Sequence, residues 1–421
     1  MYREGKVYYS KIILNYIKEN LTTVLKPPVG FIRYPFIDPG SVYDGNVWDW
    51  DTYWSVYALL PLSKELKDKA LRERIIEHAK GNVLNMLDFQ LSDGYIPMMI
   101  ENKLFDKRLS EPYLNIQHKN GVTMNMHKPF LCQQIALISK DIGDYTWIDE
   151  IKLEKLKKYF FCYEKNYYKE RVGLYVWHDD IMIGMDNDPA SFGRPKDSTA
   201  NIFLNSFMTM ELQSGAEIFT ALGDPGYARQ LSEKRLRLID AIHEECFDRR
   251  DKFFYSVDVD VYTRKYDWFH QGLGVFWKSL PIRIAVWSGF LPMLAGIATK
   301  EEAEALREHL HDEEAFGSDY GIPTLAKNEK MFNIEATNNP SNWLGPIWLV
   351  ANYCVFKGML NYGYRKEAEE LCAGSVRLLE RDIEKTGCMH EYYNPFTGEP
   401  VMNGGFINGN VLVLNMQKEL E

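Results

Sequence analysis

The chain has 421 residues and a formal net charge of −10, with 46% hydrophobic and 26% charged residues. A hydrophobic share near that of ordinary globular proteins predicts a sizeable buried core, and the length suits one repeat-built barrel. The negative charge argues against a nucleic-acid partner, because phosphate binding needs a basic surface. Aromatic residues reach 14%, which suits either a large core or a site in which flat rings stack on sugars.

The first 25 residues mix charges with apolar residues at helical spacing, so they do not predict a signal peptide. No other stretch approaches the roughly 18 apolar residues of a membrane helix. The six cysteines are scattered without a Cys-x-x-Cys pair, which favours free thiols in a reducing compartment. No spacing matches an EF-hand loop or a zinc site. We therefore expect a cytoplasmic protein without a metal or a cofactor, and without a membrane partner.

Hydrophobic periodicity predicts two alternating kinds of helix. The first kind is charged on one face, at about 6–25, 65–90, 148–168, 225–246, 300–311 and 365–385. The second kind carries few charges, at about 50–60, 128–142, 200–222, 288–298, 343–360 and 406–418. An amphipathic helix belongs on the surface and an apolar one inside. The pattern therefore predicts an all-α fold, an (α/α)6 barrel formed by residues 1–421 as a single domain. An open helical solenoid is the alternative, but no sequence repeat supports it.

The segments that lead into the predicted inner helices hold most of the glycines and prolines, at about 31–50, 94–127, 172–199, 253–287, 318–342 and 388–405. In a closed ring of helices, these segments would emerge at one rim and enclose a funnel. The alternating pattern at 253–260 predicts a small β-hairpin in this rim. The rim is therefore where distant parts of the sequence are expected to form one site.

Two rim segments each present a carboxyl group among aromatic, amide and turn-forming residues, around Asp186 and around Glu391. Hydrolysis of a glycosidic bond needs two carboxyl groups facing each other across a sugar. Asp186 has apolar and acidic neighbours that would keep it protonated, as a general acid requires. Glu391 would then be the general base, roughly 6.5–9.5 Å away so that a water fits between. For each acid the plainer alternative is a solvated turn residue.

Rings and polar side chains accompany these acids in the rim segments. The stretch from Tyr43 to Trp54 interleaves carboxyl and amide groups with rings, as a sugar pocket requires, although helix capping by Asp51 is an alternative. His390 is expected to be a hydrogen-bond partner rather than a catalyst. The predicted substrate-binding residues are Tyr43, Asp44, Trp48, Trp50, Asp51, His127, Lys128, Trp177, Asn187, Asn205, Trp343, Gly345, Trp348, His390 and Tyr392.

The chain resembles glycoside hydrolase family 63, in the clan shared with family 37 trehalases. The likeness is carried, in chain order, by Tyr43-Asp44 with Trp48-Asp49-Trp50-Asp51, His127-Lys128-Pro129, Gly184-Met185-Asp186-Asn187, Gly289-Phe290-Leu291-Pro292, Asn342-Trp343-Leu344-Gly345-Pro346-Ile347-Trp348 and His390-Glu391-Tyr392-Tyr393. The resemblance implies an (α/α)6 barrel and hydrolysis of α-glycosides with inversion. By position, Asp186 matches the general acid and Glu391 the general base.

The short chain looks like the compact bacterial branch that includes mannosylglycerate and glucosylglycerate hydrolases. Many family members have Arg where this chain has Leu344, which would remove a substrate contact. The sequence thus predicts an inverting α-glycosidase for a short α-glucoside or glycosyl-glycerate, with this small carbohydrate as its partner. A sugar epimerase on the same toroid and a non-catalytic carbohydrate-binding protein are the alternatives. An epimerase would need paired histidines, and the rim histidines form no obvious pair. The sugar, the aglycone and the oligomeric state stay open.

Overall fold

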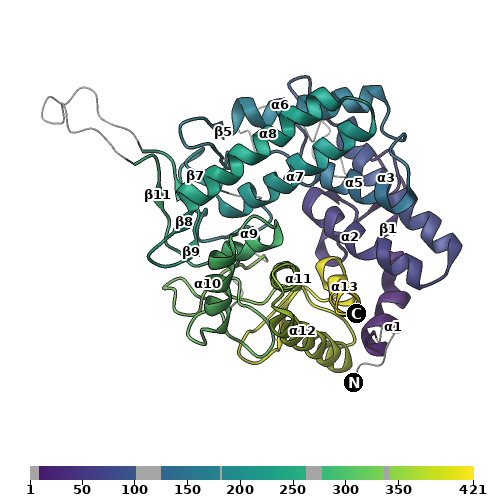
Figure 1. The fold of residues 1–421 in the computed structure, drawn as a ribbon. Coiled ribbons are helices and arrows are strands. Elements are labelled where there is room, and N and C mark those ends of the chain that lie inside the picture. Colours follow the sequence, from purple (N-terminus) through teal and green to yellow (C-terminus); the bar gives the residue numbers. More distant parts are fainter. Residues whose placement is uncertain (1–8, 101–124, 181–182, 262–276, 336–340) are drawn as a thin grey trace, which may run out of the picture.

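The computed structural model describes residues 9–100, 125–180, 183–261, 277–335 and 341–421. In these ranges the chain is mainly helical, with very short strands in the connections (Figure 1). The helices are α1 (Lys11–Asn20), α2 (Asp49–Glu65), α3 (Lys69–Asp88), α5 (Leu131–Ile142), α6 (Glu150–Asn166), α7 (Ile202–Ala221), α8 (Pro225–Ala241), α9 (Leu291–Leu294), α10 (Lys300–His311), α11 (Leu349–Asn361), α12 (Arg365–Thr386) and α13 (Leu412–Glu419).

The strands form small antiparallel pairs in the connections. They are β1 (Leu25–Lys26), β2 (Phe36–Ile37), β3 (Val47–Trp48), β4 (Met99–Ile100), β5 (Tyr168–Lys169), β6 (Leu174–Tyr175), β7 (Thr199–Ala200), β8 (Phe247–Asp248), β9 (Phe253–Phe254), β10 (Val257–Asp258), β11 (Leu280–Pro281), β12 (Tyr392–Tyr393) and β13 (Pro400–Met402). The pairs are β1–β2, β3–β4, β5–β6, β8–β9 and β12–β13, and β10 lies between β7 and β11.

The weakly charged helices of the described chain form a closed inner ring. Neighbouring contacts run from α2 to α5, α7, α9, α11 and α13, and α13 returns to α2. The charged helices lie outside this ring, with α3 on α2, α8 on α7 and α12 on α11. Helix α1 packs against α12, and the Ser10 backbone N–H donates to the Gln417 side chain of α13 at 3.2 Å. The predicted (α/α)6 barrel is confirmed.

Side-chain caps are commoner at the outer helices than at the inner ones, although the inner helix α7 is capped by Asn201 and the outer helix α12 has no such cap. Outer helices α3, α6, α8 and α10 start at Asp68, Asp149, Asp224 and Thr299, whose side chains accept hydrogen bonds from the first-turn backbone. Inner helices α2 and α11 start after Trp48 and Trp348, which are extended and provide no side-chain cap. At these two inner starts an aromatic ring replaces the usual cap, on the side of the ring where the rim segments meet.

Two inner helices are shorter than the periodicity predicts. Helix α11 begins at Leu349 rather than near 343, because Gly345 has a φ of 134° and Pro346 follows it. Helix α9 has only four residues after a 3₁₀ turn that contains Gly289. A Cβ on Gly289 would lie 2.3 Å from the ring of Phe253, so the turn is pressed against a neighbouring rim segment.

The hairpin predicted at 253–260 is confirmed only for its first half, which forms a small antiparallel hairpin with β8. Strand β9 pairs with β8, whereas β10 pairs with β7 and β11, so the two halves of the segment join different sheets. Residues 255–256 do not form a turn that pairs the two halves with each other, and each half finds a partner elsewhere in the rim. The partner of a two-residue strand is set by tertiary packing, which an alternating pattern does not encode.

None of the helices in the described ranges has the length and apolarity of a membrane span. All six cysteines lie in these ranges and have free thiols; five are buried and Cys388 is partly exposed.

Candidate active site

A small cavity lies where five of the rim segments meet, and its volume is about 70 Å³. Both predicted catalytic acids line it, although they come from opposite halves of the sequence. The lining residues are Tyr43, Trp48, Trp50, Asp51, Met98, Lys128, Gly184, Asp186, Ser341, Trp348 and Glu391. A larger cleft of about 750 Å³ lies between α10 and α12, and none of the predicted site residues lines it. The small cavity is therefore the candidate active site.

Glu391 immediately precedes β12, and its backbone N–H donates to the carbonyl of Met402. Its side chain accepts one hydrogen bond on each oxygen, from the Tyr43 hydroxyl at 2.9 Å and from the Asn403 amide. Burial raises the pKa of Glu391 to about 7, although both donors oppose this shift, and the charge of Asp186 adds to it. The carboxyl group is thus fixed in orientation and changes charge near neutral pH.

Asp186 lies in a tight loop that begins at Gly184, whose φ is 91°. A side chain at Gly184 would be strained in this conformation and would crowd Lys128 and Trp50. Burial raises the pKa of Asp186, while the charge of Lys128 and a hydrogen bond from Ser341 lower it. Because Asp186 and Glu391 each line the cavity and influence one another electrostatically, they form an interacting carboxyl pair.

Asn187 joins the loop of Asp186 to the fifth rim segment by hydrogen bonds. Its amide oxygen accepts from the backbone N–H of Trp343 at 2.6 Å, and its amide nitrogen donates to Asn342 Oδ1 at 3.0 Å. The carbonyl of Asn342 in turn accepts from the indole of Trp348 at 2.8 Å. Asn187 is buried and is not among the cavity-lining residues, so it supports the site rather than facing it.

Lys128 brings a positive charge to the cavity wall and is paired with Asp49. Its Nζ lies 2.8 Å from Asp49 Oδ1, and both side chains are at most 3% exposed. The other oxygen of Asp49 accepts from the Lys128 backbone N–H at 2.7 Å. Burial raises the pKa of the neighbouring Asp51 to about 8, against the opposing charge of Lys128. Among the described lining residues Lys128 is the only lysine or arginine, and three carboxyl groups surround it.

Aromatic rings form much of the remaining wall. Trp48, Trp50 and Trp348 line the cavity. Trp348 is held between two further rings, with Trp343 stacked at 4.0 Å and Tyr392 at 5.3 Å between ring centroids. Trp343 and Tyr392 were predicted to bind substrate, but they are buried behind Trp348 and fix its orientation.

Several other predicted substrate-binding residues do not line the cavity. Asp44 is 65% exposed in its side chain and pairs with Lys26 at the surface. His127 is buried, and its Nδ1 donates to the carbonyl of Lys128 at 2.6 Å. His390 contacts Asp382 on α12 through its Nδ1. No histidine is among the described lining residues, which gives no support to an epimerase in the described part of the site. His118 and His270 lie outside the described residues.

The remaining three predicted residues have structural contacts. Trp177 is buried and its ring lies beside that of Phe203. Asn205 on α7 exchanges hydrogen bonds with the backbone of Tyr175, accepting at 2.8 Å and donating at 2.9 Å. Gly345 packs on the ring of Phe332, where a Cβ would approach to 2.4 Å. Aromatic and amide side chains occur both in protein cores and in binding sites, and only the folded structure shows which of the two a given residue belongs to.

Sequence reasoning missed several residues of the site. Met98, Gly184 and Ser341 line the cavity, Asn403 holds Glu391, and Asn408 donates to Asp51. Asn403 has a φ of 55° and precedes two glycines, so its sequence signal is that of a turn. The turn signal was readable, but the direction of the side chain toward Glu391 depends on the β12–β13 pairing.

Comparisons with known proteins identify the family of the chain. Residues 44–407 match the family described as mannosylglycerate hydrolase MGH1-like glycoside hydrolase domain. Mannosylglycerate hydrolase MGH1 of Selaginella moellendorffii is 36% identical over 122 residues, which are 28% of this chain and 22% of that protein. Mannosylglycerate hydrolase of Thermus thermophilus is 30% identical over 166 residues, 39% of this chain and 32% of that protein. These alignments therefore span about a fifth to a third of the curated relatives.

Solved structures extend the likeness over the whole fold. A glycoside hydrolase family 63 mannosylglycerate hydrolase from Thermus thermophilus, in complex with glucose, superposes with a TM-score of 0.68 at 18% identity, covering 96% of this chain and 98% of that one. Neutral trehalase Nth1 from Saccharomyces cerevisiae superposes with a TM-score of 0.59 at 14% identity, covering 92% and 75%. These two likenesses concern the fold. Together with the family match, they confirm the resemblance predicted from the sequence.

Proposed function

The chain belongs to the mannosylglycerate hydrolase MGH1-like family of glycoside hydrolase domains, and on that premise we propose that it is an inverting α-glycosidase for a short α-glycoside. The observation that carries the proposal is that Asp186 and Glu391 share one cavity walled by indole rings. Hydrolysis with inversion needs one carboxylic acid and one carboxylate on opposite faces of a sugar. The rings supply flat apolar surfaces for the sugar faces.

We assign Glu391 as the general base. Both of its oxygens accept hydrogen bonds from neutral donors, Tyr43 and Asn403, and such bonds favour the ionised form. A carboxylate with a pKa of about 7 is also well matched to take a proton from water near neutral pH. Asp186 is then the general acid, which protonates the leaving oxygen while Glu391 deprotonates the attacking water.

The binding roles in this proposal follow from the cavity wall. Trp48, Trp50 and Trp348 stack on the sugar, while Asp51 and Lys128 bond to its hydroxyl groups. The enclosure of the cavity by rings and carboxyl groups from several rim segments favours a short substrate. The substrate class is an α-glucoside or a glycosyl-glycerate; the latter is supported by the names of the relatives.

The test is a panel of α-linked disaccharides with mannosylglycerate and glucosylglycerate, assayed for released hexose. Proton NMR of the fresh product should show the β-anomer, because inversion converts an α-glycoside into a β-sugar. Release of the α-anomer would refute inversion. The two acids are separated with an α-glycosyl fluoride, whose leaving group needs no proton. Asp186→Asn should retain far more activity on the fluoride than on the glycoside, whereas Glu391→Gln should lose both.

A further inference from the structure

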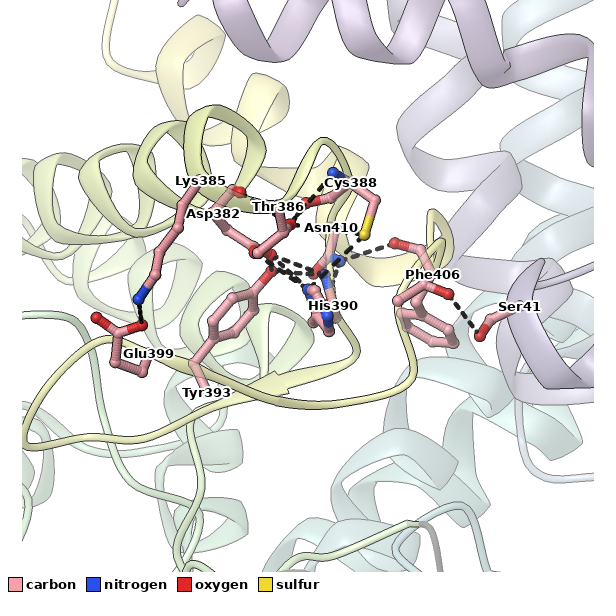
Figure 2. Close-up of polar contacts among 11 residues, drawn as sticks. Ser41, Asp382, Lys385, Thr386, Cys388, His390, Tyr393, Glu399, Phe406 and Asn410 are labelled. Atoms are coloured by element: carbon pink, nitrogen blue, oxygen red, sulfur yellow. Dashed lines mark hydrogen bonds and ion pairs between the residues drawn. The ribbon is translucent and has the colours of Figure 1, made fainter.

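His390, the residue before Glu391, belongs to a buried polar cluster centred on Asp382 in the last turns of α12 (Figure 2). The side chain of Asp382 is fully buried. It accepts from the His390 backbone N–H at 2.9 Å, from His390 Nδ1 at 3.0 Å and from the Tyr393 hydroxyl at 2.8 Å. The Thr386 hydroxyl adds a contact at 3.0 Å. Since a carboxylate only accepts, the His390 ring must carry its proton on Nδ1.

Asp382 destabilises helix α12 when the helix is considered without its tertiary contacts. An acidic side chain near a helix C-terminus is unfavourable because the helix dipole is negative there. Burying a carboxyl group adds a desolvation cost unless it is hydrogen-bonded. The compensating donors include the two residues that flank Glu391 closely in sequence, His390 and Tyr393. Asp382 therefore holds the chain by hydrogen bonds both before and after Glu391.

Further bonds extend this attachment to the rest of the rim. The Asn410 amide donates to the carbonyl of His390 at 2.8 Å. Tyr393 and Ile347 exchange backbone hydrogen bonds of 2.8 and 3.0 Å, which joins the loop of Glu391 to the segment that Asn187 braces. The cluster thus links the backbones that carry the two cavity acids. Such links matter because a displacement of about 1 Å can cost roughly a hundredfold in rate.

A nucleophilic role for Cys388 does not fit this geometry. Cys388 Sγ lies 3.9 Å from His390 Nδ1, the same nitrogen that faces Asp382. In a nucleophile–histidine–carboxylate triad, the nucleophile and the carboxylate contact opposite ring nitrogens. The proton on Nδ1 is directed to Asp382, so His390 offers no base to the thiol at this nitrogen.

We propose that Asp382 and His390 are positioning residues, which hold the carboxylate of Glu391 in line with the cavity. This inference rests on the proposed role of Glu391 as general base. Neither residue lines the cavity, so both act through the backbone of the loop that carries Glu391.

The test compares Asp382→Asn with Glu367→Gln. Glu367 is a buried acid on the same helix, with a side chain 4% exposed, and it bonds to Arg307 and His311 away from the cavity. Asp382→Asn should lower kcat about a hundredfold with KM within about twofold. The loss should be equal on the glycoside and on the α-glycosyl fluoride, because the base is needed for both. Glu367→Gln should keep kcat within about twofold. Equal kcat values for the two variants at the same folded fraction would overturn the proposal.

Two further measurements keep the inference independent of folding yield and of the proposed function. Tyr393→Phe removes one donor to Asp382 but keeps the ring, and it should lower kcat about tenfold without a change in KM; an unchanged kcat counts against the proposal.

Crystal structures of the variants give a readout that does not depend on activity. The 2.9 Å bond between Tyr43 and Glu391 should be lost in Asp382→Asn and kept in Glu367→Gln. If the bond persists in both variants, positioning by Asp382 is refuted. Absent turnover in the unmodified chain would instead refute the proposed function.

Discussion

The hydroxyl group of Tyr43 donates a 2.9 Å hydrogen bond to Glu391, although 348 positions separate the two residues in the sequence. The bond spans the first and last rim segments, which the closed ring of inner helices makes neighbours. Burial of the Tyr43 hydroxyl, followed by the charge of Glu391, raises the pKa of this tyrosine far above its usual range. Tyr43 is therefore a neutral donor around neutral pH.

Removing the Tyr43 hydroxyl should disturb the charge of Glu391 more than the fold. In Tyr43→Phe the carboxylate loses one of its two donors, so its pKa should rise further and kcat at neutral pH should fall about tenfold. The pH–rate profile of kcat/KM measures this change as an acidic limb displaced to higher pH. Tyr57→Phe is a matched control, because Tyr57 bonds to Tyr353 between inner helices. An unshifted limb in Tyr43→Phe would contradict the assigned role of this bond.

The pH dependence of the intact chain should show an acidic limb near pH 7. Burial raises the pKa of Glu391 from 4.5 to about 7, and a general base works only when ionised. Activity should therefore rise as the pH increases through about 7 and fall again when Asp186, whose pKa is also raised, loses its proton. Initial rates between about pH 4 and pH 10 check this expectation. A profile flat from about pH 5 to pH 8 would exclude Glu391 as the titrating base.

Replacing Glu391 with Gln should stabilise the fold at high pH. A carboxyl group whose pKa is raised in the folded state holds its proton more tightly there than in the unfolded chain. Stability is therefore lost as the pH rises from about 4.5 through about 7. Gln stays neutral, so Glu391→Gln should gain on the order of 1–3 kcal/mol at about pH 8. The gain should disappear near pH 4. Urea unfolding at both pH values measures it, and a gain that is the same at both would disagree with this cause.

Asn205→Ala distinguishes a structural residue from a substrate-binding one. The sequence predicts that Asn205 binds substrate, but its amide bonds to the backbone of Tyr175 and Asn201. The substitution leaves a buried N–H and buried carbonyls without these partners, which should cost about 2–4 kcal/mol of unfolding free energy. KM should stay within about twofold for the protein that remains folded. A raised KM with unchanged stability would restore the sequence-based role.

Breaking the buried ion pair of Lys128 and Asp49 should destabilise the fold strongly. Lys128→Met leaves the carboxylate of Asp49 buried without its cation, which should cost about 3–5 kcal/mol. It also removes the positive charge that lowers the pKa of Asp186, so the alkaline limb of the rate profile should move to higher pH. The double variant Lys128→Met with Asp49→Asn is the control and should recover part of the lost stability. Thermal unfolding of the unmodified chain, the two single variants and the double variant measures the coupling, and strict additivity would contradict it.

Local sequence patterns were enough to predict the barrel and to single out Asp186 and Glu391 as its candidate acids. Helix period and charge pattern are local properties, so the alternation of charged helices such as α3 with apolar helices such as α7 was readable residue by residue. Asp186 and Glu391 stood out because carboxyl groups among rings, amides and turn residues are an unusual local combination. That both line one cavity followed from the expected closure of the ring.

Only the tertiary structure decided which side chains face the cavity. Trp348 lines it while Trp343, from the same rim segment, lies stacked behind it. Asn403 reaches Glu391, whereas Asn205 on α7 bonds to the backbone of Tyr175 in β6. In irregular rim segments no period ties a residue to a face, unlike in a helix or a long strand. The direction of each side chain is set there by contacts with distant parts of the ring, which exist only after the ring has closed.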